Sequence, residues 1–114
     1  MKFCGVCHSD VHIGENHLTG CMYPCVPGHE LCGTVTEVGP DVTKVKVGDN
    51  VGVGCIIDSC LDCEMCKIGD EMLCENGGST HTYNTMKGKY EALGKTSHVN
   101  GNKDVQTFGG YSGS

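Results

Sequence analysis

The stretch Pro27-Gly28-His29-Glu30-Leu31-Cys32-Gly33, which runs on through β-forming residues to Val42, decides how this chain is read. His29 offers an imidazole nitrogen that suits a borderline-soft metal such as zinc. Glu30 beside it can act as a metal ligand, as an outer hydrogen-bond acceptor or as a proton acceptor. The alternating residues that follow predict a strand. The stretch therefore predicts a metal ligand at the mouth of a strand.

Size and composition limit the classes of protein that fit. The chain has 114 residues with 18 glycines and no tryptophan, which favours one mainly β domain with short elements over a helical bundle. Its net charge is −6 and it contains no arginine, which argues against a nucleic-acid partner. The longest apolar run, residues 51–57, is far shorter than the ~20 residues of a membrane span. Met1 leads straight to Cys4 without a secretion signal, so we expect a cytoplasmic protein.

Ten cysteines in so short a chain permit two interpretations. One is a secreted disulfide framework, and the other is a reduced intracellular metalloprotein. The even count does not separate them. The lack of a leader sequence and the tight two-residue spacings favour metal binding.

Four cysteines lie within fifteen residues, in the pattern Cys60-x2-Cys63-x2-Cys66-x7-Cys74. Short spacings let neighbouring thiolates wrap one ion, and the longer segment returns a fourth. Four thiolates predict a closed, structural zinc site. A pair of disulfides or an iron–sulfur cluster fits less well, because no proline follows the loop and reducing compartments disfavour disulfides.

A second site of another kind is predicted from Cys7 and His29, which can meet only through the fold. A catalytic zinc needs three protein ligands and an open position. Either Glu30 is the third ligand or the third ligand lies beyond Ser114. Taken singly, Cys7 is better explained as a small buried apolar residue and His29 as an ordinary core histidine.

Short elements are expected between these motifs. Ser9 or Asp10 is expected to cap a short helix over residues 11–13, followed by a loop over 15–25. Residues 45–47 and 51–53 alternate around a turn and predict a hairpin. We further expect a helical turn over 63–68 and a strand over 105–108. Cys32 and Cys55 fall in apolar runs and are expected in the core.

Taken together, the motifs rule out the separate explanations of Cys7 as a buried apolar residue and His29 as an ordinary core histidine. Gly28-His29-Glu30-x2-Gly33-x5-Gly39-x2-Val42 resembles the signature of zinc-containing alcohol dehydrogenases of the medium-chain dehydrogenase/reductase superfamily. Cys7-His8-Ser9-Asp10-x-His12 and the four-cysteine loop stand in the matching order. The sequence of residues 5–10, 23–29 and 53–60 is most similar to the cinnamyl-alcohol dehydrogenase-like, NADP-dependent subgroup.

The resemblance implies a GroES-like, partly open β-barrel as a partial catalytic domain over residues 1–114, with a structural zinc lobe at about 55–78. It implies a catalytic zinc on Cys7, His29 and a later cysteine, which is the two-cysteine, one-histidine ligand set known for alcohol dehydrogenases. The Rossmann domain of the family has no counterpart here, since Gly52-Val53-Gly54 is not a dinucleotide-binding motif. The complete enzyme would use NADP(H) and form a homodimer.

The resemblance also assigns roles residue by residue. Ser9 matches the hydroxyl that relays the alcohol proton, and His12 matches the next group on that path. Asp10 matches a residue that supports the zinc ligands, and Glu30 matches the residue next to a ligand. His8 is a weaker candidate for contact with the cofactor phosphate.

The leading interpretation is therefore a fragment of a zinc-dependent oxidoreductase that interconverts small alcohols and aldehydes, inactive alone. A zinc-stabilised scaffold without catalysis is the alternative from another class. Polyol and formaldehyde dehydrogenases share the zinc motifs and remain open as alternatives within the enzyme class.

Overall fold

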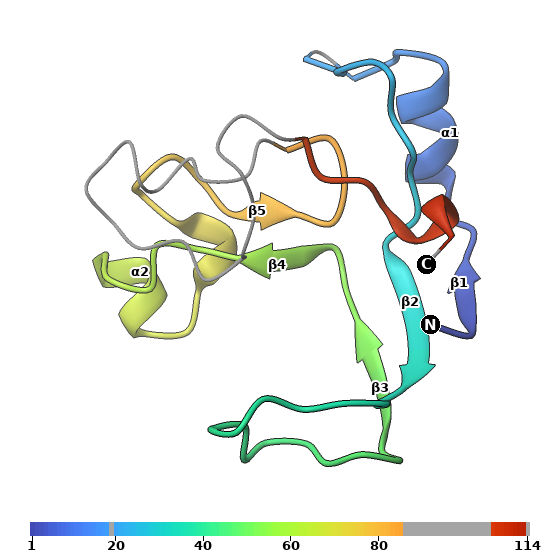
Figure 1. The fold of residues 1–114 in the computed structure, drawn as a ribbon. Helices are drawn as coiled ribbons and strands as arrows, with labels where there is room; N and C mark the ends of the chain where they lie inside the picture. Colours follow the sequence, from blue (N-terminus) through green and yellow to red (C-terminus); the bar gives the residue numbers. More distant parts are fainter. Residues whose placement is uncertain (19, 86–105, 114) are drawn as a thin grey trace.

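The computed structural model describes residues 1–18, 20–85 and 106–113, and these are mainly strands and loops with short helices (Figure 1). A three-stranded and a two-stranded antiparallel sheet form two parts of the molecule. The expected class, mainly β with short helices, is confirmed. Nothing in the described ranges is a helix long and apolar enough to span a bilayer.

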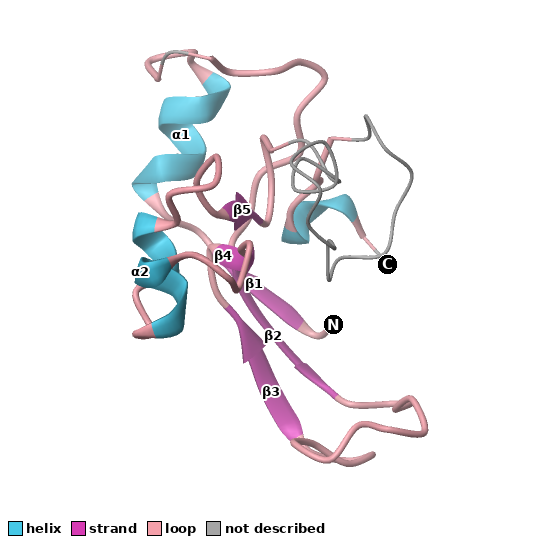
Figure 2. Ribbon diagram, turned by 90° about the vertical axis from the view of Figure 1, so that its left-hand side faces the viewer, coloured by secondary structure: helices cyan, strands magenta, loops and turns pink. Residues whose placement is uncertain are grey.

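The three-stranded sheet brings the segment before Cys7 next to the segment after His29. Strands β1 (Phe3–Gly5), β2 (Glu30–Thr34) and β3 (Asn50–Val53) lie side by side in this order (Figure 2). Gly5 pairs with Glu30 in the register of β1 and β2. Because β1 ends just before Cys7 and β2 begins just after His29, this pairing carries two distant sequence motifs to one edge of the sheet.

The predicted hairpin over residues 45–53 is wrong. Residues 45–47 are not a strand, and β3 pairs instead with β2, from Leu31 opposite Val53 to Thr34 opposite Asn50. Residues 35–49 form the long connection between them, held by backbone bonds between Val35 and residues 48 and 49. The alternation at residues 51–53 did indicate a strand, β3. This strand pairs with β2, which provides a longer pairing partner than residues 45–47 could across a short turn.

Helix α1 (His8–Gly14) confirms the expected short helix, but its cap differs from the prediction. Cys7 occupies the N-cap position, and Asp10 lies in the first turn with its Oδ2 accepting the Cys7 N–H at 2.9 Å. A carboxylate in the first turn satisfies a backbone donor that the helix leaves unpaired. The helix start therefore fixes Cys7, Ser9 and Asp10 together.

The second part of the molecule is a lobe around the four cysteines. It contains β4 (Ile56–Asp58), α2 (Glu64–Lys67), the 3-10 turn η1 (Glu71–Leu73) and β5 (Thr80–His81). Strands β4 and β5 pair antiparallel at its base. Helix α2 confirms the helical turn expected between Cys63 and Ile68.

Residues 106–113 return to the start of the chain, where the 3-10 helix η3 (Gly110–Ser112) lies beside β1 and β2 (Figure 1). The Gly109 N–H donates to Val26 at 2.7 Å and the Gly110 N–H donates to Gly28 at 2.9 Å. The strand expected over 105–108 is reduced to a bridge at Gln106, and Val105 lies outside the described residues.

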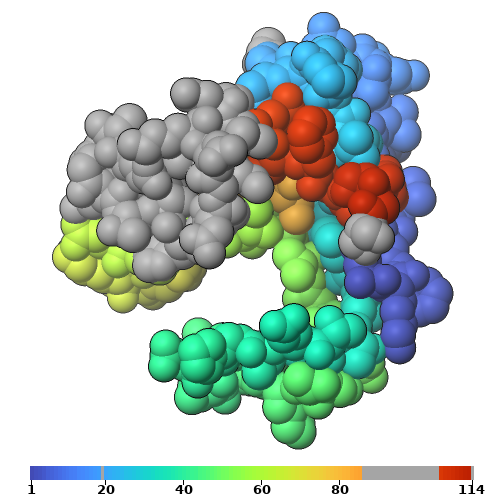
Figure 3. All heavy atoms as spheres, viewed as in Figure 1, coloured from blue at the N-terminus to red at the C-terminus, as the bar shows by residue number. Residues whose placement is uncertain are grey.

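Few apolar side chains are fully buried. Among described residues, the buried apolar set is Ile13 with three cysteines of the lobe. Cys32 and Cys55, expected in the core, are exposed. Cys32 lies on a solvent-facing side of β2, and Cys55 lies in the bend between β3 and β4. The space-filling view shows a deep hollow between the connection at residues 35–49 and the lobe (Figure 3).

Candidate metal centres

The four sulfurs of the lobe converge on one point. Cys60, Cys63, Cys66 and Cys74 place their Sγ atoms within 4.8 Å of one another, and Cys60 and Cys66 are 3.8 Å apart. A tetrahedral zinc with bonds of about 2.3 Å requires sulfurs about 3.8 Å apart. The donor set and its spacing therefore fit a closed four-thiolate zinc site.

The protein around these sulfurs favours thiolates at some positions. The Asp62 N–H lowers the pKa of Cys60, and burial opposes this effect. Hydrogen bonds from the Cys63 N–H and the Asn76 amide lower the pKa further, so that it falls to about 6. At Cys66 the Ser59 hydroxyl lowers the thiol pKa, but burial and the neighbouring thiols outweigh this effect and raise the pKa to about 11. Four thiolates this close repel one another, so their joint ionisation needs a cation among them.

The second group consists of Cys7, His29 and Glu30, whose ligand atoms also lie within 4.8 Å of one another. Cys7 and His29 are half-buried and Glu30 is exposed. A thiol, an imidazole and a carboxylate form a mixed donor set with room for a further ligand, which fits an open zinc site. The structure thus brings together the three residues predicted from sequence, while their role as ligands stays a prediction.

Asp10 holds this second group in place. Its Oδ1 accepts the Gly28 N–H at 3.0 Å and faces His29 Nδ1 at 3.2 Å, while its Oδ2 accepts the Cys7 N–H and the Tyr111 hydroxyl at 2.9 Å. A carboxylate only accepts hydrogen bonds, so a neutral His29 in this contact carries its proton on Nδ1, which leaves the Nε2 lone pair available to a metal.

The charge on Asp10 is preserved despite its burial. Burial raises the pKa of this carboxyl, but the N–H of Cys7, the hydroxyl of Tyr111 and the N–H of Gly28 outweigh it and lower the pKa overall. At Cys7, the Ser9 hydroxyl, 3.5 Å from the sulfur, lowers the thiol pKa. Both effects favour the ionised forms that a metal ion requires.

A pocket of about 340 Å³ opens beside these residues. Ser9 and His29 line it together with apolar and aromatic side chains, namely Ile13, Leu18 and Tyr83. A small organic molecule in this pocket would lie against both the Ser9 hydroxyl and the His29 ring. A larger hollow of about 540 Å³ lies at the lobe, away from these groups.

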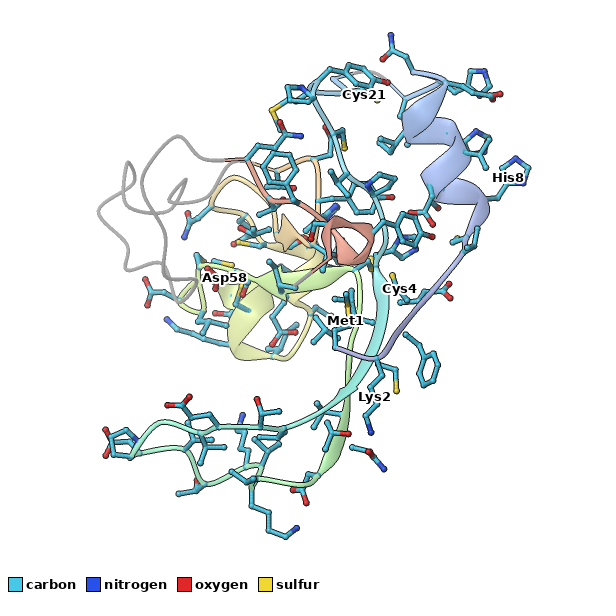
Figure 4. The ribbon with its side chains drawn as sticks, turned by 45° about the vertical axis from the view of Figure 1, so that its right-hand side comes forward. Met1, Lys2, Cys4, His8, Cys21 and Asp58 are labelled. Atoms are coloured by element: carbon cyan, nitrogen blue, oxygen red, sulfur yellow. The ribbon has the colours of Figure 1, made fainter. Side chains whose placement is uncertain are left out.

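Two further residues predicted for the site lie along α1. His8 begins the helix and extends outward from it (Figure 4), with its ring centroid 4.7 Å from that of His12. His12 contacts His17, and no hydrogen bond joins it to Ser9 among the contacts of the described residues. The predicted proton path from Ser9 to His12 therefore remains a prediction.

Sequence reasoning missed two tyrosines. The Tyr111 hydroxyl bridges Asp10 and the Gly5 carbonyl, and the Tyr83 ring lies 5.7 Å from that of His29. Burial and then the charge of Asp10 raise the pKa of Tyr83 to about 12. Burial and then the hydrogen bond to Asp10 raise the pKa of Tyr111 to about 12. No spacing rule links tyrosines at these positions to residues near the start of the chain.

Residues 1–109 match the family described as the alcohol dehydrogenase GroES-like domain. Since the match covers almost the whole chain, the chain belongs to this family. The mainly β fold, with its four-cysteine lobe, agrees with the GroES-like architecture implied by the sequence resemblance.

The relatives extend the same similarity. The chain is 46% identical over 113 residues to NADP-dependent alcohol dehydrogenase C 1 of Mycolicibacterium smegmatis, covering 99% of this chain and 28% of that protein. It is 57% identical over 81 residues to a mannitol dehydrogenase of Apium graveolens, covering 71% of this chain and 22% of that protein.

Among solved structures, the CAD of Helicobacter pylori complexed with NADP(H) superimposes with a TM-score of 0.76 at 35% identity, covering 95% of this chain and 27% of that chain. The chain thus spans about a quarter of the length of the relatives it matches.

Proposed function

We propose that this chain is the zinc-binding catalytic part of an oxidoreductase that interconverts alcohols and aldehydes with NADP(H). One observation carries the proposal. The donor atoms of Cys7, His29 and Glu30 converge beside a pocket that the Ser9 hydroxyl also lines. The relatives, which include an NADP-dependent alcohol dehydrogenase and a mannitol dehydrogenase, support this reaction class without fixing the substrate.

Cys7 and His29 would hold a catalytic zinc, with Glu30 or a residue outside the described part as the third ligand. Cys60, Cys63, Cys66 and Cys74 would hold a structural zinc. The catalytic ion, when bound, supplies Lewis-acid polarisation of the substrate oxygen. We further expect a cytoplasmic homodimer.

The chain's own residues orient the substrate and handle its proton. Asp10 keeps the proton of His29 on Nδ1, so that Nε2 faces away from the carboxylate. The Ser9 hydroxyl lies beside the Cys7 sulfur and at the pocket wall. It would accept the alcohol proton while passing its own proton on toward solvent, and the reverse reaction would run the same two transfers backward. Ile13, which is buried, and Leu18 form the apolar side of the pocket.

Replacing Ser9 tests this mechanism in a protein that includes its nucleotide-binding part. Ser9→Ala should lower turnover of an aldehyde with NADPH by about 10²- to 10⁴-fold, the usual contribution of a positioned proton-transfer group. Zinc content should not change, because Ser9 is not a ligand. Ser112→Ala, at an exposed position, is the matched control. Unchanged turnover in Ser9→Ala would remove Ser9 from the mechanism.

The alternative is a zinc-stabilised scaffold with a single metal ion in the lobe. The two functions differ in metal content. The enzyme proposal expects two zinc ions per chain by atomic emission, with one lost in Cys7→Ser. A scaffold with only the four-thiolate site would hold one ion and would be insensitive to that substitution.

A further inference from the structure

The end of α1 brings two histidine rings together. Asn16 has a left-handed backbone conformation with φ of 55°, its N–H donates to Ile13, and the His17 N–H donates to the His12 carbonyl at 2.9 Å. These two bonds define a Schellman motif, which packs the side chains at the positions of His12 and His17 against each other. That contact is usually apolar, whereas here it joins two imidazoles.

The nitrogen atoms of these rings have the separation of two ligands on one ion. His12 Nδ1 and His17 Nδ1 are 3.2 Å apart, and their ring centroids are 5.5 Å apart. Two nitrogens on a tetrahedral zinc, with bonds of 2.0–2.1 Å, lie about 3.3 Å apart. The helix end therefore sets the spacing before any ion arrives.

A third donor lies beside His17. Glu15 Oε2 is 3.4 Å from His17 Nδ1, and the side chains of His17 and Glu15 are 55% and 59% exposed. An exposed carboxylate can rotate toward an ion held by the two rings. Two imidazoles with one carboxylate are a donor set that zinc and neighbouring transition metals accept.

We propose that His12, His17 and Glu15 form a surface site for a divalent transition-metal ion such as Zn²⁺, which shares no ligand with the two centres described above. The backbone of the Schellman motif pre-positions the two rings, so binding orders little besides the Glu15 side chain. Solvent and the exposed carboxylate complete the coordination. A simple hydrogen bond between the two rings is the competing explanation of the same 3.2 Å contact.

Calorimetry separates these two explanations. The chain is saturated with Zn²⁺, dialysed to remove loosely held metal, and titrated with further Zn²⁺ at about pH 7.5, where most imidazoles are neutral. We expect one additional equivalent to bind. His17→Asn should abolish it, and Glu15→Gln should weaken it by about tenfold or more. His8→Asn, a neighbouring histidine on the same helix, is the matched control and should retain it.

Nitrogen NMR of the histidine rings tests the site in the unaltered chain. Added Zn²⁺ should shift the Nδ1 resonances of His12 and His17 and leave those of His8 in place. A chain that takes up no further equivalent would overturn the proposal. So would binding that survives His17→Asn, or ring shifts at His8 in place of His17.

Discussion

At the scale of single residues, Asp10 connects more of the candidate catalytic centre than any ligand does. Its two oxygens receive groups from the start of α1, from the motif at Gly28 and His29, and from Tyr111. Sequence resemblance predicted a supporting role for Asp10. It did not predict four partners, because two of them are backbone N–H groups and one is a tyrosine about a hundred residues away.

Asp10→Asn should disturb both stability and metal binding. An amide matches the shape of the carboxylate but has no charge, and its NH₂ group cannot accept the bonds that one oxygen now accepts. We expect a loss of about 2 kcal/mol in the free energy of unfolding, and zinc affinity at Cys7 and His29 weaker by about 10- to 100-fold. Urea denaturation and competition with a zinc chelator measure these effects. Asp41→Asn, at an exposed position, should change neither.

At the scale of elements, the four-cysteine lobe was the easiest part to predict. All its thiols lie within fifteen residues, so local spacing alone specified the cluster and the helical turn inside it. Cys7 and His29 meet only because β1 pairs with β2, and spacing could not show this. The resemblance implied that Cys7 and His29 share an ion, but it did not specify which strands pair. The failed hairpin at residues 45–53 shows that an alternating pattern can mark a strand where none forms and does not identify a strand's partner.

Cys66→Ser tests the lobe as a unit. The Cys66 sulfur is buried and close to Cys60. A serine hydroxyl stays protonated and is a poor zinc ligand, so this variant should retain one zinc fewer than the parent chain after dialysis. Cys32→Ser, at an exposed thiol, should keep full metal content. Equal zinc in the Cys66 and parent chains would contradict a structural zinc here.

The connection at residues 35–49 offers a pH test away from any metal. The Lys46 side chain, followed by its backbone N–H at 3.0 Å, lowers the pKa of Asp49. The folded carboxyl therefore ionises below its unfolded value, and its stabilising contribution is present above that value and fades as pH falls through the folded pKa. NMR titration of the Asp49 carboxyl should give a midpoint below 3.8, and Lys46→Met should move it upward. Identical midpoints in the two chains would contradict the pairing.

At the scale of the whole molecule, residues 106–113 close over the region that contains the candidate catalytic centre. Gly109 and Gly110 have no side chains at the point where this segment touches the backbone of Pro27 and Gly28. In the sequence, such a glycine pair is typical of a simple turn. Their actual use, close approach between distant backbones, leaves no local pattern.

Gly109→Ala should therefore destabilise the fold. A Cβ there would lie 2.3 Å from the Gly28 carbonyl oxygen, and backbone cannot move aside as a side chain can. We expect a loss of about 3 kcal/mol in the free energy of unfolding, toward the upper end for overpacking. Gly54→Ala, where a Cβ meets nothing within 4 Å, is the control. Equal urea midpoints for the two variants would show that the segment is not packed here.

Because residues 106–113 contact residues 26–28 and Asp10, these contacts form late in the translation of this part of the chain. A nascent chain that has emerged through His81 already contains all four cysteines of the lobe and both strands at its base. Asp10 gains Tyr111 only after the ribosome has added residues 106–113. The four thiols of the lobe can therefore come together before Asp10 has gained its Tyr111 hydrogen bond.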